Sequence, residues 1–162
     1  MFSLLPTDRP IQGVEIGLCQ GHNAIRLLTN LPNLHLTAID PFEGYDDYCG
    51  HISTDTLQVR EGTAMRSLEP FAGRFTFIKR YSDAALELLA DGAFDFVYID
   101  GNHSGKWPLH DITHYWHKVK SRGILCGHDR SLPDVAQALV DFGRGFTPTD
   151  EPQSDSWYMI KP

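Results

Sequence analysis

The chain has 162 residues and is 41% hydrophobic and 22% charged, which is ordinary for a soluble globular protein and predicts a single domain over residues 1–162. Its net charge of −7, with no local cluster of Lys and Arg, argues against nucleic acid as a partner and favours a small or neutral one. No apolar run approaches the roughly 18 residues that span a bilayer, and the first ten residues lack the features of a signal peptide, so we expect no membrane association and a cytoplasmic location.

Short apolar runs alternate with longer helical stretches along most of the chain. Strands are predicted at 13–18, 34–40, 75–81, 94–100 and 123–129, and helices at 22–31, 55–68, 82–91, 109–120 and 133–142. This alternation is typical of β-α-β units, which build a parallel sheet with helices on both faces. The sequences FTPTDEP and SWYMIKP then follow with no helix between them, which predicts an antiparallel hairpin at the C-terminus.

The first predicted strand runs into a glycine turn, in the sequence VEIGLCQGHN. Gly17 and Gly21 would let the backbone approach a ligand closely, and the helix that follows presents free N–H groups. Such a turn is as often only a tight turn as a ligand loop. The dinucleotide fingerprint G-x-G-x-x-G would place its second glycine where this chain has Cys19.

Acidic and hydroxyl side chains follow the second and third predicted strands. Asp40 ends the second strand 19 residues after Gly21, where an acid can hydrogen-bond ribose hydroxyls, although it can also simply cap the strand before Pro41. Ser82 and Asp83 follow the third strand. Ser82 is suited to cap the next helix, and an adenine could lie against the same polar groups.

The fourth predicted strand, in FDFVYIDGNH, ends in Asp100 and His103, and the fifth ends in His128 and Asp129. If these strands are neighbours in a parallel sheet, their carboxyl ends converge, and Asp100, His128 and Asp129 could hold a divalent cation. Carboxylates suit Mg²⁺, whereas an imidazole ligand shifts the preference toward Mn²⁺, Fe²⁺ or Zn²⁺. His103 is a candidate general base. The alternative is a turn at Asp100 and a buried, hydrogen-bonded His128.

The segments VEIGLCQG, AIDPF, YSDAALELL, FDFVYIDGNH, RGILCGHD and SWYMIK, in this order, resemble a class I S-adenosylmethionine-dependent methyltransferase. The nearest branch is the small O-methyltransferases whose fourth strand ends in IDG-x-H and whose fifth ends in GHD. The resemblance covers the chain from about Gly13 to Lys161. It implies an α/β, Rossmann-like, doubly wound sheet of seven strands in the order 3-2-1-4-5-7-6, mostly parallel with an antiparallel C-terminal strand.

The resemblance also implies roles for matching residues. The cofactor-binding residues would be Glu15, Gly17, Gly21, Asp40, Pro41, Ser82, Asp83 and Asp100. Among these, Asp40 would bind the ribose diol, Ser82 and Asp83 would lie beside the adenine, and Asp100 would lie near the transferred methyl group. In metal-dependent relatives the aspartate matching Asp100 binds Mg²⁺, and a Lys or His at the place of His103 takes the substrate proton.

Two departures from this pattern affect the expected acceptor side. The metal-dependent relatives carry Asp-Asp or Asp-Asn where this chain has His128 and Asp129. They also have N-terminal helices over the substrate, whereas only about a dozen residues precede the first strand here. The acceptor site is therefore expected to be completed by the 41–54 loop or by a second subunit of a homodimer, and Phe42, Tyr45 and Tyr48 of that loop could contact the acceptor.

The implied activity is the methylation of a small-molecule hydroxyl, with S-adenosylmethionine as cofactor and a divalent cation as an optional one. Methyl transfer from a sulfonium requires an aligned oxygen and the loss of its proton, which Asp100, Asp129 and His103 would provide. Three alternatives remain open: a zinc hydrolase built on His110 and His114 of LHDITHYWH, a nicotinamide-dependent oxidoreductase, and a non-catalytic cofactor-binding module.

Overall fold

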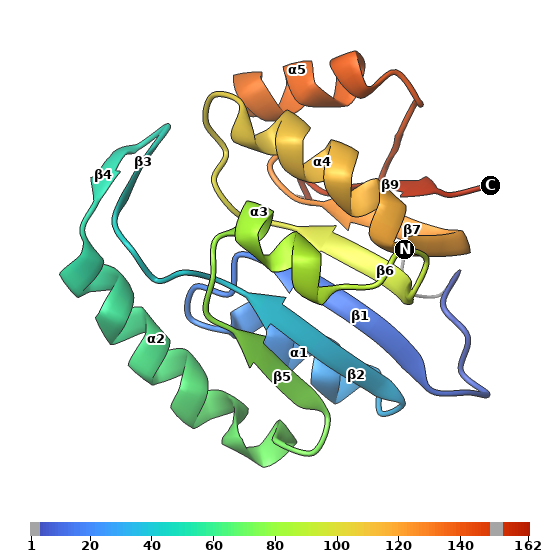
Figure 1. Ribbon diagram of the computed structural model, residues 1–162, viewed down its shortest axis with the longest axis horizontal. Helices are drawn as coiled ribbons and strands as arrows, with labels where there is room; N and C mark the ends of the chain where they lie inside the picture. The colour runs from blue at the N-terminus through green and yellow to red at the C-terminus, as the bar shows by residue number, and fades with distance from the viewer. Residues whose placement is uncertain (1–3, 150–153) are drawn as a thin grey trace.

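The computed structural model describes residues 4–149 and 154–162, which contain a seven-stranded sheet with the order β5-β2-β1-β6-β7-β9-β8 (Figure 1). Its strands are β1 (Ile11–Ile16), β2 (Leu34–Ile39), β5 (Phe75–Ile78), β6 (Phe94–Ile99), β7 (Val119–Gly127), β8 (Thr147–Pro148) and β9 (Trp157–Ile160). Numbered along the chain within this sheet, the order is 3-2-1-4-5-7-6. The first five strands are parallel and β9 is antiparallel to both β7 and β8, so the predicted fold class and terminal hairpin are confirmed.

Helices cover both faces of the sheet. α1 (His22–Asn30) and α2 (Thr54–Leu68) pack with one core cluster, and α3 (Ser82–Ala85), α4 (Trp107–Lys118) and α5 (Pro133–Phe142) pack with the other. Figure 1 shows α3, α4 and α5 in front of the strands and α1 behind them. All six residues of β6 are buried, as expected for a central parallel strand covered on both sides.

The predicted helix at 82–91 is wrong in length. α3 has only four residues and is followed by a 3₁₀ turn, Leu86–Leu88, after which Leu89 is extended. The apolar side chains of Leu86 and Leu89 both pack against the core. A spacing of three residues matches the 3₁₀ period, which places these two side chains on one side.

The 41–54 segment was expected to be a loop, but it contains an antiparallel hairpin. β3 (Tyr45–Asp47) pairs with β4 (Gly50–Ile52), and Figure 1 shows the hairpin as an arm that projects away from the main sheet. Gly50 adopts a φ of +106°, which an L side chain rarely tolerates, and this permits the tight turn between the strands. A hydrogen-bond contact of 2.8 Å between His51 Nδ1 and Asp46 Oδ1 joins the two strands.

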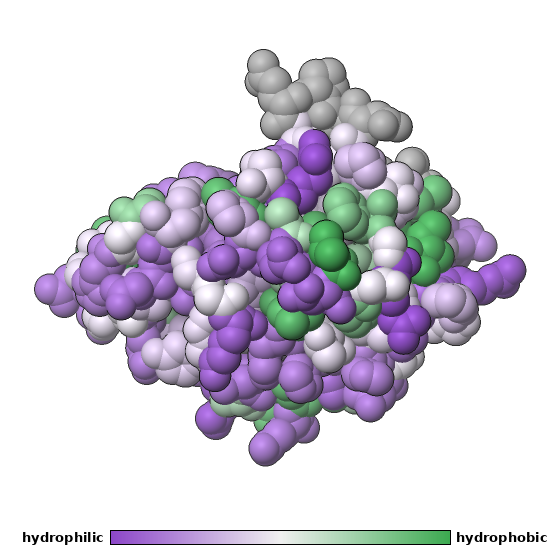
Figure 2. Space-filling view, turned by 90° about the horizontal axis from the view of Figure 1, so that it is seen from above, coloured by the Kyte–Doolittle hydropathy of each residue, from purple (hydrophilic) through white to green (hydrophobic). Residues whose placement is uncertain are grey.

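Among the described residues, no helix has the length and apolar character needed to cross a bilayer. The face seen from above in Figure 2 is mainly hydrophilic, with smaller groups of apolar side chains between the polar ones.

Candidate active site

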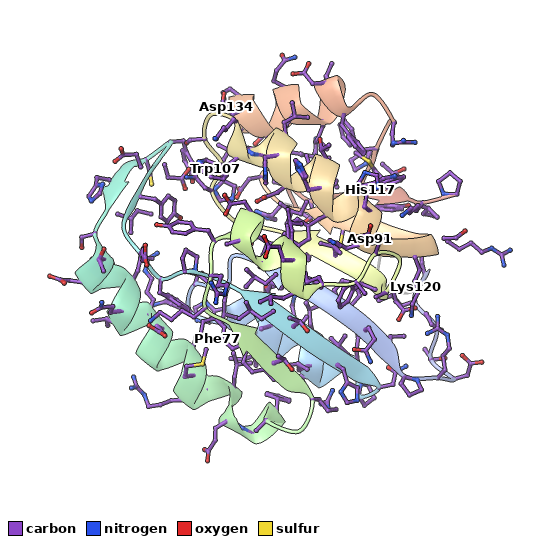
Figure 3. All side chains as sticks on the ribbon, viewed as in Figure 1. Phe77, Asp91, Trp107, His117, Lys120 and Asp134 are labelled. Atoms are coloured by element: carbon purple, nitrogen blue, oxygen red, sulfur yellow. The ribbon has the colours of Figure 1, made fainter. Side chains whose placement is uncertain are left out.

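A cavity lies at the carboxyl ends of β1, β2 and β6, beside the start of α3 and of α4. This is the edge at which open α/β sheets bind ligands. Its apolar wall includes Ile39, Leu57 and Trp107, and Figure 3 labels Trp107 at the first turn of α4, on the side from which the β3–β4 hairpin projects. Five residues expected to bind the cofactor line the cavity: Gly17, Asp40, Pro41, Ser82 and Asp100. Glu15, Gly21 and Asp83, which were also expected to bind it, do not line this cavity.

The turn after β1 is built from three residues with positive φ: Gly17 at 89°, Cys19 at 48° and Gly21 at 79°. At Gly17 the reason is close packing, because a Cβ there would lie 1.9 Å from the carbonyl oxygen of Asp100. Gly21 is the N-cap of α1, and its N–H donates to the carbonyl of Leu18. Cys19 therefore adopts a glycine-like conformation in the place where the dinucleotide fingerprint has glycine.

Asp40 holds this turn in place from β2. Its Oδ2 accepts hydrogen bonds from the backbone N–H groups of Leu18 and Cys19, both at 3.0 Å, and its Oδ1 accepts from Phe42 N at 2.8 Å. Burial raises the pKa of Asp40, while the three backbone N–H donors oppose the rise. The side chain thus supports the turn and also faces the cavity, so the two interpretations of Asp40 are compatible.

Glu15 is buried beneath the same turn. Its Oε1 accepts a hydrogen bond from Asn23 Nδ2 at 2.8 Å, whereas its Oε2 is enclosed and has no hydrogen-bond partner among the residues that the structure describes. Burial raises the pKa of Glu15 to about 8, and the bond from Asn23 only partly offsets this. An unsatisfied buried carboxylate oxygen is costly and is suited to a donor such as an ammonium group.

Replacing Glu15 with Gln is expected to remove a pH-dependent loss of stability. An unfolded Glu titrates near 4.5 and folded Glu15 near 8, so between these values the folded protein keeps a proton that the unfolded chain has lost. The free energy of unfolding should therefore fall as the pH rises through this window in the wild type, and fall less in E15Q. Urea denaturation at pH 5 and pH 8 measures the difference. Identical pH slopes in the two proteins would contradict the assignment.

The polar groups beside α3 differ from those expected. Ser82 lines the cavity, but its hydroxyl does not cap a helix; it donates to Asp111 Oδ1 of α4 at 2.7 Å. Asp83 accepts from the N–H of Ala84 at 2.7 Å and lies outside the cavity lining. Asp111, which stands between His110 and His114 in the sequence, lines the cavity and is buried.

Next to this cavity, Asp100, His103 and Asp129 bring ligand-type atoms within 4.8 Å of one another. His103 Nε2 lies 3.3 Å from Asp100 Oδ1 and 3.0 Å from Asp129 Oδ2. Asp129 adopts a φ of 55°, a conformation that is uncommon outside glycine and that occurs here at the end of β7. Such a group of two carboxylates and an imidazole fits the donor set of a divalent cation.

His128 was expected to complete this group, but the structure places it outside the 4.8 Å cluster. Its Nδ1 lies 3.1 Å from Asp129 Oδ1, whereas His103 contacts the other oxygen of this carboxylate, Oδ2. His103 therefore takes the position among the carboxylates that was predicted for His128. Hydrogen bonds from His103 and His128 lower the pKa of Asp129.

A third carboxylate reaches His103 from the β3–β4 hairpin. Asp47 Oδ2 lies 3.2 Å from His103 Nδ1, and Asp47 Oδ1 accepts a hydrogen bond from Ser104 Oγ at 3.1 Å. The side chain of Asp47 is only 5% exposed. Burial by itself would lower the pKa of His103, but the hydrogen bonds to Asp100, Asp129 and Asp47 raise it to about 10. Without a cation, His103 is thus an imidazolium at neutral pH.

The aromatic residues of the 41–54 segment are divided among three environments. Phe42 is buried and packs edge-on against Phe77 at a centroid distance of 5.8 Å, so its expected contact with the acceptor is wrong. Tyr45 lines the cavity. Tyr48 is 62% exposed and stands edge-on to the ring of His103 at a centroid distance of 6.0 Å. It therefore remains a candidate for contact with the methyl acceptor.

The geometry of His110 and His114 does not favour the zinc alternative. Their rings are stacked at a centroid distance of 4.1 Å, and His114 Nδ1 lies 2.8 Å from the carbonyl oxygen of His110. Within the part of the chain that the structure describes, the only group of three suitable side chains is Asp100, His103 and Asp129.

Comparisons with known proteins agree with this geometry. The family model described as "Methyltransferase domain" matches residues 14–130. No curated protein matches the sequence. Solved structures with the same fold include a Staphylococcus aureus protein provisionally assigned as a caffeoyl-CoA O-methyltransferase, with a TM-score of 0.66 and 14% identity over 94% of this chain and 76% of that one.

Two further structures show how widely the fold is used. An O-methyltransferase family protein from Burkholderia thailandensis has a TM-score of 0.66 and 14% identity, over 96% of this chain and 52% of that one. Spermidine synthase from Thermotoga maritima, named for a different reaction, has a TM-score of 0.65 and 11% identity, over 99% of this chain and 59% of that one. At such identities the likeness concerns the fold alone. The family match covers most of the chain, from the first strand through both carboxylates of the cluster, and the chain belongs to the methyltransferase domain family, in the class I S-adenosylmethionine-dependent type.

Proposed function

We propose that this protein transfers the methyl group of S-adenosylmethionine to a hydroxyl of a small molecule, with the help of a divalent cation. The observation that carries the proposal is the position of Asp100, which lines the cavity expected to hold the cofactor and is also part of the Asp100, His103 and Asp129 cluster. An acceptor bound beside Asp100 would therefore have the cofactor on one side, and His103 and Asp129, which can take up its proton, on the other.

The cavity residues suit the cofactor. Asp40 and Asp100 offer carboxylate oxygens to hydroxyl groups and to a cationic centre, and Ile39 and Leu57 offer apolar surface to a base. The buried oxygen Oε2 of Glu15, which has no partner among the described residues, is suited to accept a hydrogen bond from a donor group of the cofactor close to the turn after β1. Binding in this cavity would hold the reacting carbon near Asp100 and exclude water from it, which is the main demand of an in-line displacement.

The acceptor side depends on His103. Its imidazole is held by Asp100 and Asp129 on Nε2 and by Asp47 on Nδ1, so both ring nitrogens have fixed partners. We assign to His103 the removal of the acceptor proton in the state in which a cation on Asp100 and Asp129 would have displaced the proton of Nε2, with Asp47 as the residue that orients the ring. No covalent intermediate on the protein is needed, because the acceptor oxygen attacks the methyl carbon directly and S-adenosylhomocysteine leaves.

A divalent cation held by Asp100 and Asp129 would lower the pKa of the acceptor hydroxyl and place its oxygen. A cation held there would compete with the Nε2 proton of His103 for the same carboxylate oxygens, because Nε2 contacts both. Two carboxylates suit Mg²⁺, and recruitment of His103 as a third ligand would favour Mn²⁺, Fe²⁺ or Zn²⁺.

Methyl transfer to a panel of phenolic and sugar hydroxyls, with and without chelator and with Mg²⁺ or Mn²⁺ added back, tests this proposal. We expect turnover that chelator abolishes and a cation restores. Undiminished turnover in chelator would contradict only the part of the proposal that concerns the metal, and methyl transfer itself would stand. Binding of S-adenosylhomocysteine without turnover on any acceptor would favour the non-catalytic module, and failure to bind it would contradict the whole proposal.

Asp47→Asn is expected to lower kcat by about 10-fold to 100-fold while leaving the affinity for S-adenosylhomocysteine within about twofold, because removing an orienting group weakens proton transfer but leaves the cavity intact. Asp46→Asn is the matched control, since Asp46 is the neighbouring residue and its exposed carboxylate contacts His51 across the hairpin rather than His103. Steady-state kinetics of both variants provide the measurement. Equal losses in the two variants would assign the effect to the hairpin as a whole.

A further inference from the structure

Asp111 is a buried acid that lines the cavity. The residue lies in α4, is 3% exposed and lines the cavity together with Ser82 of α3 and Trp107 of α4. Its Oδ1 accepts from Ser82 Oγ at 2.7 Å and lies 3.3 Å from His110 Nδ1. Among the described residues, no hydrogen bond is formed by its Oδ2.

This oxygen is also not sealed inside the protein. The enclosed side-chain atoms without a partner, within the described ranges, are Glu15 Oε2 and Arg130 Nε, and Asp111 Oδ2 is not among them. Because Asp111 lines the cavity, its unpartnered oxygen is accessible from there. Burial raises the pKa of Asp111, while the hydrogen bonds from Ser82 and His110 oppose that rise and favour the carboxylate as an acceptor.

The surroundings of Asp111 indicate which ligand group its unpartnered oxygen would bind. Trp107 begins the same helix and presents an aromatic surface to the cavity, and Ile39 contributes aliphatic surface. Flat apolar walls with one hydrogen-bond acceptor at the rim are suited to a heterocycle that carries an amine. Asp83, the acid first expected beside the base, lies outside the lining and accepts the N–H of the residue that follows it.

We propose that Asp111 Oδ2 accepts a hydrogen bond from the 6-amino group of the cofactor's adenine, and that this contact makes the site select a 6-amino purine over a 6-oxo purine. The inference rests on the proposed function, because it takes S-adenosylmethionine as the occupant of the cavity. Ser82 acts as a positioning residue: its hydroxyl binds Oδ1 and so turns Oδ2 toward the cavity.

The test compares the affinities of S-adenosylhomocysteine and S-inosylhomocysteine, which carries an oxygen in place of the 6-amino group, by isothermal titration calorimetry. The wild-type protein should bind the adenosyl ligand at least about 10-fold more tightly, since the oxo group would face the lone pairs of Asp111. In Asp111→Asn, the donors on Ser82 and His110 hold the amide oxygen at the Oδ1 position, so the amide NH₂ faces the cavity. The preference should then fall to about 1 or reverse.

Two further variants keep the assignment falsifiable. Asp83→Asn should retain the wild-type ratio of affinities; a lost preference in Asp83→Asn, with an unchanged one in Asp111→Asn, would overturn the proposal. If Asp111→Asn does not fold, Ser82→Ala should still reduce the ratio several-fold, and an unchanged ratio there would contradict the inference. A wild-type protein that binds both ligands equally refutes this inference alone, whereas one that binds neither refutes the proposed function.

Discussion

His103→Ala is expected to lower kcat for methyl transfer by about 10²- to 10⁴-fold, the usual effect of removing a positioned general base. The imidazole contacts Asp47, Asp100 and Asp129, so the substitution removes the group that links the three carboxylates. The affinity for S-adenosylhomocysteine should change little, because His103 does not line the cofactor cavity. Initial rates at saturating cofactor, together with calorimetry, measure both quantities.

His117→Ala is the matched control for this experiment. His117 lies in the last turn of α4, is exposed, and is labelled in Figure 3 at the end of that helix far from the hairpin. The His117→Ala substitution should leave kcat within about twofold of the wild-type value, as most substitutions at exposed positions do. A His103→Ala protein that binds cofactor and turns over at the wild-type rate would rule out His103 as the proton acceptor.

Gly17→Ala is expected to lower the melting temperature by about 4 to 20 °C and to abolish cofactor binding. The new Cβ would lie 1.9 Å from the backbone oxygen of Asp100, and no rotation of a side chain relieves a clash with backbone. Overpacking costs about 1–3 kcal/mol, and a positive φ of 89° adds about 1–2 kcal/mol for a residue with a Cβ. In a protein of this size each kcal/mol corresponds to roughly 2–4 °C.

Gly73→Ala provides the comparison, because a Cβ at Gly73 meets no atom within 4 Å. Its melting temperature should stay within about 2 °C of the wild-type value, or rise slightly through the reduced entropy of the unfolded chain. Thermal denaturation followed by circular dichroism measures both variants. A Gly17→Ala protein as stable as Gly73→Ala would show that β1 and β6 do not approach as closely as the structure describes.

The sheet could be predicted from the sequence because its signal is repeated. Apolar runs such as FDFVYI alternate with helical stretches, and parallel strands need this spacing for their crossovers. The position of the site at the carboxyl ends followed from the same rule, which is why Gly17, Asp40 and Asp100 were expected together and do line one cavity. The antiparallel C-terminal strand was recognised from the missing helix before SWYMIK.

The contacts that were not predicted join segments without a local pattern. Asp47 lies 56 residues before His103, and it belongs to a three-residue strand, which is too short to show alternation. Asp111 stands between two histidines in a helix, and the spacing of those histidines suggested metal binding, whereas the carboxylate turns inward to Ser82. Periodicity indicates which side of a helix is buried, but not which polar group on the opposite element it will meet.

The projecting arm formed by β3 and β4 makes the charge on His103 depend on events outside the main sheet. Asp47 is one of three anionic neighbours that keep the imidazole protonated, and it is the only one carried by that arm. Any molecule that pushes the arm aside thereby weakens the hold on the ring proton. By thermodynamic reciprocity, loss of that proton must equally weaken the contact that holds the arm against His103.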